Sequence, residues 1–172
     1  MAQNRAGGQN APALTTIANS SRELIDAMSD IVWAINPQKD HLSDLNQRMR
    51  RFAADVLTAR NVELDFRAPM QDKDVELGAN IRREVFLIFK ETVNNMVKHS
   101  GLTRAEIEFR ISDGDLVLRA SDNGRGFDTN GESDGHGLMS MRERTAALDG
   151  TMEIVSAPGE GTTITLRAPL DN

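Results

Sequence analysis

Five segments of this 172-residue chain alternate apolar and polar side chains, and this pattern constrains the fold more than any other feature. Successive side chains of a β-strand point to opposite faces, so each segment predicts a strand with one dry and one wet face. The apolar positions are Val62, Leu64 and Phe66; Ile107, Phe109 and Ile111; Leu116, Leu118 and Ala120; Met152 and Ile154; and Ile164, Leu166 and Ala168. Strands buried on both faces would be continuously apolar. We therefore expect a largely antiparallel sheet with helices packed on one face only.

Apolar side chains at helical spacing predict three helices in the first hundred residues. Leu24, Met28 and Ile31 indicate a helix over residues 17–35, and Pro37 marks the boundary after it. The other two are expected at about residues 42–59 and 80–98. Residues 1–16, mostly polar or small, are expected to form a flexible tail. The segment Ser112-Asp-Gly-Asp115 is expected to be the turn of a hairpin.

Composition limits the kinds of protein that the chain can be. With 39% hydrophobic and 27% charged residues and no long apolar run, it predicts one soluble domain with an extension and no membrane contact. The absence of cysteine excludes disulfides and thiolate metal sites, and we infer a cytoplasmic location. A net charge of -6 gives no general attraction to nucleic acid. The basic group Arg48, Arg50 and Arg51 is expected to be a solvated helix face or a protein contact.

The third predicted helix carries a polar stripe of Glu91, Asn95 and Lys98, spaced by four and three residues. An asparagine oxygen can complete a magnesium shell made mainly of phosphate oxygens and water. Glu91 could accept a proton or orient water, and Lys98 could meet a phosphate. Taken alone, the stripe is more often a solvent-facing helix surface.

Asp122 ends the third predicted strand on the side of its apolar residues, the face that helices are expected to cover. A carboxylate there needs a partner because an unpaired buried charge is costly, and the amino group of adenine is one such donor. Gly124 and Gly126 would let the main chain turn closely around a base. The alternative for this motif alone is an ordinary Asp-Asn-Gly turn.

Two glycine motifs follow. Gly135-His-Gly137 opens a helix, whose first amides can bind an anion, and residues 128–134 before it could form a short lid. Gly159-Glu-Gly-Thr162 joins two predicted strands, and Thr162 could bond near the base. Each motif alone is more often a helix start or a hairpin turn. Four unrelated turns would rarely occur in this order and at this spacing, so the four motifs together favour a nucleotide site.

In this combination the chain resembles the ATP-binding catalytic domain of sensor histidine kinases, of the superfamily shared with DNA gyrase, heat-shock chaperone and mismatch-repair ATPases. The four motifs are similar to the family's N, G1, G2 and G3 boxes in order. The segments around Lys98, Asp122, Gly137 and Pro158 resemble most the subgroup that pairs with nitrate-response-type regulators. The resemblance implies a Bergerat-type two-layer α/β sandwich with a mixed, largely antiparallel sheet of about five strands. It also implies a remnant of the second dimerisation helix and its junction at residues 17–37, and a catalytic domain at 38–172.

The resemblance implies roles for individual residues, ATP as the nucleotide and Mg²⁺ as its metal. Asn95 corresponds to the magnesium ligand, Asp122 to the adenine partner and Glu91 to a catalytic base. The remaining nucleotide-binding positions are Asn94, Lys98, His99, Gly124, Gly126, Phe127, Gly135, His136, Gly137, Leu138, Met139 and Thr162.

The histidines depart from the family pattern. A phosphoacceptor histidine is usually followed by an acidic residue, but His41, His99 and His136 precede Leu, Ser and Gly. We expect a monomeric catalytic fragment that phosphorylates a histidine on a dimerisation domain absent from this chain, for relay to a response regulator. The parent kinase would be a homodimer and could be membrane-anchored. The alternatives are a serine kinase of the anti-sigma-factor type and a non-catalytic nucleotide-binding module.

Overall fold

The computed structural model describes residues 11–34, 36, 41–68, 75–129 and 135–170. By its contacts the chain divides into two compact units, Met1–Asn36 and Pro37–Asn172. Within the described ranges, no helix has both the length and the apolar character needed to cross a bilayer.

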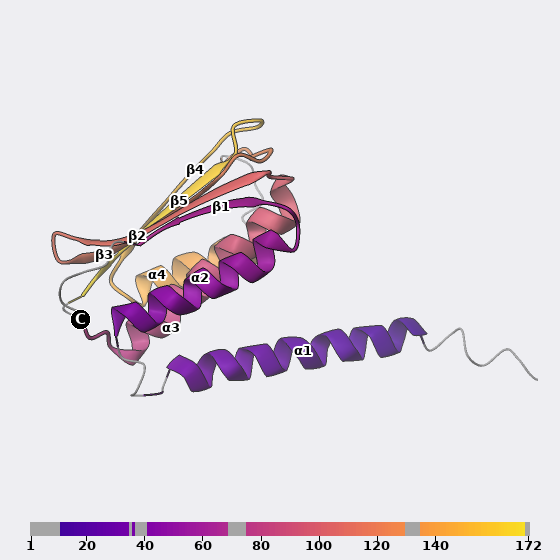
Figure 1. Ribbon diagram of the computed structural model, residues 1–172, viewed down its shortest axis with the longest axis horizontal. Helices are drawn as coiled ribbons and strands as arrows, with labels where there is room; N and C mark the ends of the chain where they lie inside the picture. Colours follow the sequence, from indigo (N-terminus) through magenta and orange to yellow (C-terminus); the bar gives the residue numbers. More distant parts are fainter. Residues whose placement is uncertain (1–10, 35, 37–40, 69–74, 130–134, 171–172) are drawn as a thin grey trace, which may run out of the picture. The chain divides into compact units, whose positions relative to one another are not determined.

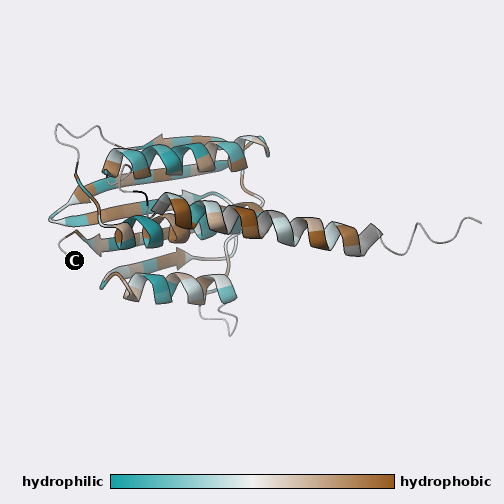
Figure 2. Cartoon of the chain, turned by 90° about the horizontal axis from the view of Figure 1, so that it is seen from below, coloured by the Kyte–Doolittle hydropathy of each residue, from teal (hydrophilic) through white to brown (hydrophobic). Residues whose placement is uncertain are grey.

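The first unit contains one helix, α1 (Ala11–Ala34), among its described residues. It begins six residues before the predicted start at 17, so residues 11–16 of the expected tail are helical; residues 1–10 lie outside the described part. Alanine favours helix, and Pro12 is tolerated because it falls in the first turn, where amides lack helical partners. Apolar side chains recur along α1 (Figure 2) and are exposed: Leu24 67%, Met28 66% and Ile31 48%.

The second unit is a two-layer α/β sandwich (Figure 1). Its described residues form the helices α2 (Leu42–Thr58), α3 (Ala79–Asn95) and α4 (His136–Ala146), with a π-helical turn η2 (Met96–Ser100) after α3. Its strands are β1 (Glu63–Arg67), β2 (Arg104–Ser112), β3 (Asp115–Asp122), β4 (Thr151–Ser156) and β5 (Thr162–Pro169). The three α-helices of this unit cover one face of the sheet, as the alternation predicted (Figure 1).

Strand order in the sheet is β1-β2-β3-β5-β4. β1 runs parallel to β2 and the other neighbours are antiparallel, which confirms the mixed, largely antiparallel prediction. The predicted hairpin is also present: Ser112 pairs with Asp115, and Asp113 and Gly114 have φ of 58° and 86°. Two consecutive residues with positive φ suit a tight hairpin loop because their twist matches that of the strands.

The core lies between the sheet and the helices. Its fully buried side chains include Leu45, Met49 and Leu57 of α2, Val85, Ile88 and Phe89 of α3, Met141 of α4, and Ile107, Leu116 and Leu166 of the sheet. Phe52 packs edge-on against Phe86 and Phe89, with ring centroids 6.1 and 6.2 Å away, and joins α2 to α3. The basic group on α2 is partly a packing feature, since the Arg48 guanidinium lies 4.5 Å from the Phe86 ring centre.

The third predicted helix, 80–98, is present but changes character near its end. α3 is α-helical to Asn95, and η2 then continues to Ser100, where Gly101 with φ 63° ends it. A π-helical turn widens a helix locally and is frequent at functional sites. Here it carries Lys98 and His99, two of the residues expected to bind nucleotide.

Candidate functional site

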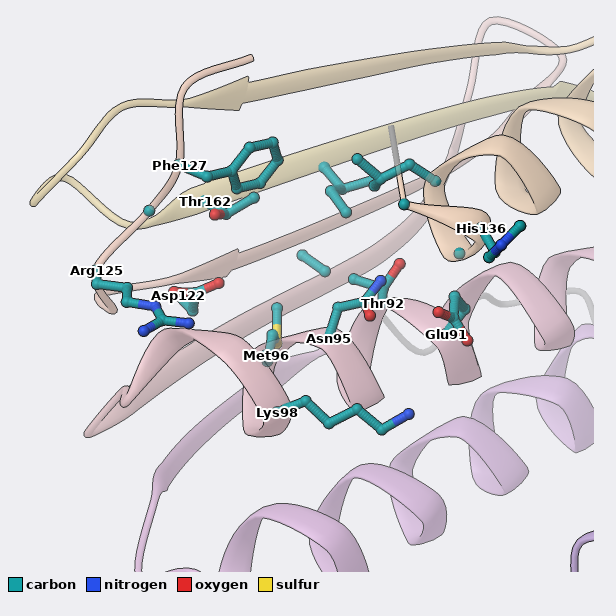
Figure 3. Close-up of a pocket in the computed structure, with 16 residues that line it drawn as sticks. Glu91, Thr92, Asn95, Met96, Lys98, Asp122, Arg125, Phe127, His136 and Thr162 are labelled. Atoms are coloured by element: carbon teal, nitrogen blue, oxygen red, sulfur yellow. The ribbon is translucent and has the colours of Figure 1, made fainter. Parts of the chain in front are cut away.

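A cavity of about 460 Å³ lies between α3 with η2, the end of β3, the start of β5 and the start of α4 (Figure 3). It brings together most of the predicted site residues: Glu91, Asn95, Lys98, Asp122, Gly126, Phe127, Gly135, His136, Gly137, Leu138 and Thr162. Three others are described but do not line it: Asn94 is half-buried, Gly124 is buried and Met139 is 56% exposed. The side chain of His99 lies outside the described part.

Five lining residues are additions to the prediction: Thr92, Met96, Ala120, Arg125 and Ile164. Two of them could have been found from the alternation, because Ala120 and Ile164 lie two residues from Asp122 and Thr162 on the same strand faces. Thr92 lies on α3 next to Glu91, and Met96 begins η2 directly after Asn95. Arg125 lies within the Asp122–Gly126 motif, but the motif assigned it no role.

Asp122 lies at one end of the cavity, only 8% exposed. Its Oδ1 accepts a hydrogen bond from the amide of Gly124 at 2.8 Å. Met96, Ala120 and Ile164 line the same cavity and give it apolar walls. A carboxylate beside apolar walls can fix a flat heterocycle by a hydrogen bond while the walls bury its faces.

The residue after Asp122 has a structural task. Asn123 Oδ1 accepts from the amides of Thr103 and Arg104 at 3.0 and 2.9 Å, and its Nδ2 donates to Thr103 Oγ1 at 2.9 Å. These bonds tie the end of β3 to the start of β2. They hold the strand end that carries Asp122 in place.

Close backbone packing explains the glycines on either side of this end. A Cβ on Gly126 would collide with the carbonyl oxygen of Ala157, and one on Gly161 with that of Asp122. Both glycines have positive φ, 57° and 75°, which other residues rarely adopt. Gly159 donates its amide to Arg125 O at 2.6 Å, so the loop after β3 and the β4–β5 turn are joined.

The other end of the cavity is formed where α4 begins. A Cβ on Gly137 would collide with the Glu91 carboxylate and would lie 3.5 Å from Asn95 Nδ2, so α4 approaches α3 closely there. Figure 3 shows Asn95 between the Asp122 end and the end with Glu91 and His136. The first turn of a helix has amides without helical partners, which favour anionic groups such as phosphates.

The donor set at this end fits magnesium. The amide oxygen of Asn95 is a hard oxygen donor at the cavity wall, and the carboxylate of Glu91 lies four residues before it on the same helix face and also lines the cavity. A site with few protein ligands suits magnesium bound mainly by phosphates and water.

Two contacts hold the rest of α4 against α3. Thr92 Oγ1 lies 3.5 Å from Met141 Sδ in the buried interface. Arg144 Nη1 lies 2.7 Å from Glu84 Oε2, and Arg83 Nη1 lies 2.8 Å from the other oxygen of the same carboxylate. Because Glu84 is only 5% exposed, this ion pair fixes the position of α4 and therefore of its first turn.

A one-faced mixed sheet and a cavity with a buried carboxylate at one end and a helix start at the other define a nucleotide-binding α/β domain. Residues 80–172, more than half of the chain, match the family of histidine kinase-, DNA gyrase B- and HSP90-like ATPases. The chain belongs to this family.

The curated relatives of this chain are sensor proteins. The chain is 34% identical over 115 residues to the sensor protein VraS of Staphylococcus aureus and equally to that of Staphylococcus epidermidis. These matches cover 64% of the chain and 33% of each relative, so the chain spans about a third of their length. The resemblance to sensor histidine kinases is confirmed, and the chain carries a histidine-kinase-type ATP-binding catalytic domain. The nitrate-response-type subgroup stays a prediction.

Solved structures agree on the fold. Histidine kinase AdeS of Acinetobacter baumannii superposes with a TM-score of 0.68 over 98% of this chain and 88% of its own, at 14% identity. The histidine kinase domain of the blue-light-activated kinase EL346 of Erythrobacter litoralis gives 0.61 over 74% and 61%, at 18% identity. At such identities the likeness concerns the fold alone.

Proposed function

We propose that this chain holds magnesium ATP and positions its γ-phosphoryl group for transfer to a histidine on a dimerisation domain. The observation that carries this proposal is the continuity of the cavity from Asp122 to the start of α4. One nucleotide can therefore meet a base-reading carboxylate and phosphate-binding groups at the same time. The chain's own His41, His99 and His136 lack the acidic neighbour of an acceptor, so the acceptor is expected on another domain.

Each end of the cavity has a proposed task. Asp122 accepts a hydrogen bond from the adenine amino group, with Thr162 beside it and Gly126 and Phe127 against the base. The segment from Gly135 to Leu138 binds phosphates through its amides, and Lys98 supplies positive charge to them. Asn94, Gly124 and Met139 stay proposed at the periphery of the site, and nucleotide binding by His99 stays a prediction.

The reaction needs alignment more than covalent help from the protein. The acceptor histidine nitrogen bonds to the γ-phosphorus while the bond from that phosphorus to the β–γ bridging oxygen breaks, and ADP leaves. Asn95 would hold magnesium, which would supply charge neutralisation at the phosphates when bound. Glu91 would accept a proton from, or orient, the incoming nucleophile. Fixing donor and acceptor in line is the main contribution of the domain.

The parent protein is proposed to be a cytoplasm-facing homodimeric kinase that passes the phosphoryl group to an aspartate of a response regulator. Residues 17–37 would belong to its second dimerisation helix and the junction to the catalytic domain.

A phosphotransfer assay tests the proposal. The chain is incubated with radiolabelled ATP, magnesium and the histidine-bearing dimerisation helices of a homologous sensor kinase, and the label is tested for acid lability. Acid-labile label on the helices, lost with Asn95→Ala and with an acceptor lacking its histidine, is the expected result. Acid-stable label would favour the serine kinase, and ATP binding without transfer to any acceptor would favour the non-catalytic module.

A further inference from the structure

Three polar side chains form a row across neighbouring strands at the base end of the cavity. Asp122 of β3 lies opposite Thr162 of β5, and Thr162 lies opposite Ser156 of β4. Directly opposite residues share a face of the sheet, so all three side chains are on the helix-covered face. Asp122 and Thr162 line the cavity (Figure 3), and Ser156 lies behind Thr162 as seen from Asp122.

The Ser156 hydroxyl has three partners. It accepts from the Phe127 amide at 2.9 Å, donates to the Gly161 carbonyl at 2.9 Å, and lies 2.9 Å from Thr162 Oγ1. A serine hydroxyl has one hydrogen and two lone pairs. An amide can only donate and a carbonyl can only accept, so the hydrogen goes to Gly161 and one lone pair to Phe127. The remaining lone pair faces Thr162, so the Thr162 hydroxyl must be the donor.

This assignment decides what Thr162 can offer to a ligand. Its single hydrogen is used by Ser156, so towards the cavity its oxygen is an acceptor only. The neighbouring Asp122 carboxylate is also an acceptor. The base end of the cavity therefore presents two adjacent acceptors.

We propose that Ser156 is a positioning residue that fixes the Thr162 hydroxyl as an acceptor and thereby makes the site select purines with an exocyclic amino group at position 6. The inference rests on the proposed function, in which Asp122 and Thr162 face the base. An amino group has two hydrogens, one for each acceptor. A keto oxygen at the same position has only lone pairs and would find no donor from either Asp122 or Thr162. Burying it there without a hydrogen bond would cost binding free energy.

The discriminating ligands are ATP and inosine triphosphate, whose bases differ at position 6 by an amino group against a keto oxygen and at position 1 by a bare nitrogen against an N–H. The dissociation constants of both are measured by calorimetry for the wild type and Ser156→Ala. Without Ser156 the Thr162 hydroxyl can rotate and donate to the keto oxygen, so we expect the preference for ATP to fall roughly tenfold, the size of one hydrogen bond. If Ser156 had a purely structural role, its loss would weaken the binding of both nucleotides equally and leave the ratio of their dissociation constants unchanged.

Further variants separate the explanations. Ser156→Thr keeps the hydroxyl and should keep the wild-type ratio of the dissociation constants for the two nucleotides. In a protein that already carries Thr162→Val, adding Ser156→Ala should not change this ratio further. The matched control is Ser121→Ala, because Ser121 makes the same kind of contact with Thr163 at 2.9 Å on the opposite face of the sheet. Ser156→Cys, whose thiol is a poor acceptor, replaces the alanine variant if that variant does not fold.

The outcomes are distinguishable. A wild type that binds neither nucleotide would overturn the proposed function and this inference with it. A wild type that prefers ATP, with the same ratio in Ser156→Ala or Ser156→Cys, would overturn the inference alone.

Discussion

At the scale of single residues, Gly137 and Gly135 make a matched pair at the start of α4. A Cβ on Gly137 would meet the Glu91 carboxylate, whereas no described atom lies within 4 Å of a Cβ on Gly135. We expect Gly137→Ala to force the Glu91 side chain into another rotamer and thereby weaken magnesium ATP binding by about 1–3 kcal/mol, the usual cost of such overpacking. Gly135→Ala should bind like the wild type. Calorimetry on both variants measures their affinities for magnesium ATP. Equal affinities would contradict the expectation that a Cβ at Gly137 disturbs the nucleotide site.

The positions of candidate-site residues were predictable from the sequence where they depend on the periodicity of a single strand or helix. Alternation put Asp122 on the buried face, and helical spacing put Glu91 and Asn95 on one side of α3. Ser156 was not predictable, because its hydrogen bonds to Phe127, Gly161 and Thr162 depend on the register of β4 and on a loop far away in the sequence.

At the scale of elements, the Glu84–Arg144 pair should stabilise the docking of α4 on α3. Arg144→Met leaves the 5% exposed Glu84 with Arg83 as a partner, so we expect a loss of about 1–3 kcal/mol in the free energy of unfolding. Urea denaturation measures it. Adding Glu84→Met should recover part of the loss, because the buried carboxylate that Arg83 alone then compensates is removed. Additive losses would argue against coupling between the two helices.

The exposed Arg67–Asp65 pair on β1 is the control for that experiment. Arg67 donates a hydrogen bond to Asp65 and lowers the pKa of that carboxyl. A lowered pKa contributes stability above the carboxyl's ordinary pKa, and the contribution is lost as the pH falls through the lowered value. Because the pair is exposed, Arg67→Met should have little effect at neutral pH and still less in acid.

The elements themselves were largely predictable, because periodicity reports burial directly. The five strands, the hairpin at Asp113 and Gly114, and the spans of α2 and α3 agree with it. Two features could not be read from periodicity. The early start of α1 rests on helix propensity rather than on an apolar stripe, and η2 keeps the apolar spacing of a helix while changing its hydrogen bonding.

At the scale of the whole molecule, the exposed apolar side chains of α1 should cause weak self-association. Leu24, Met28 and Ile31 lie at helical spacing with about half or more of their surface exposed. We expect a monomer at low concentration and growing association at higher concentration in light scattering. Leu24→Gln combined with Met28→Gln should suppress the association and leave ATP binding unchanged. A stable dimer at low concentration would contradict the expected monomer.

The central claim is that one nucleotide lies in the cavity with its adenine at Asp122. The most direct test is calorimetric titration of the wild type and Asp122→Asn with magnesium ATP and magnesium GTP. Asparagine keeps an oxygen for the Gly124 amide but loses the charge, so ATP should bind more weakly by about 1–3 kcal/mol with the fold intact, and GTP should bind the wild type poorly. Unchanged ATP affinity in Asp122→Asn, or equal affinity of the wild type for ATP and GTP, would contradict the account.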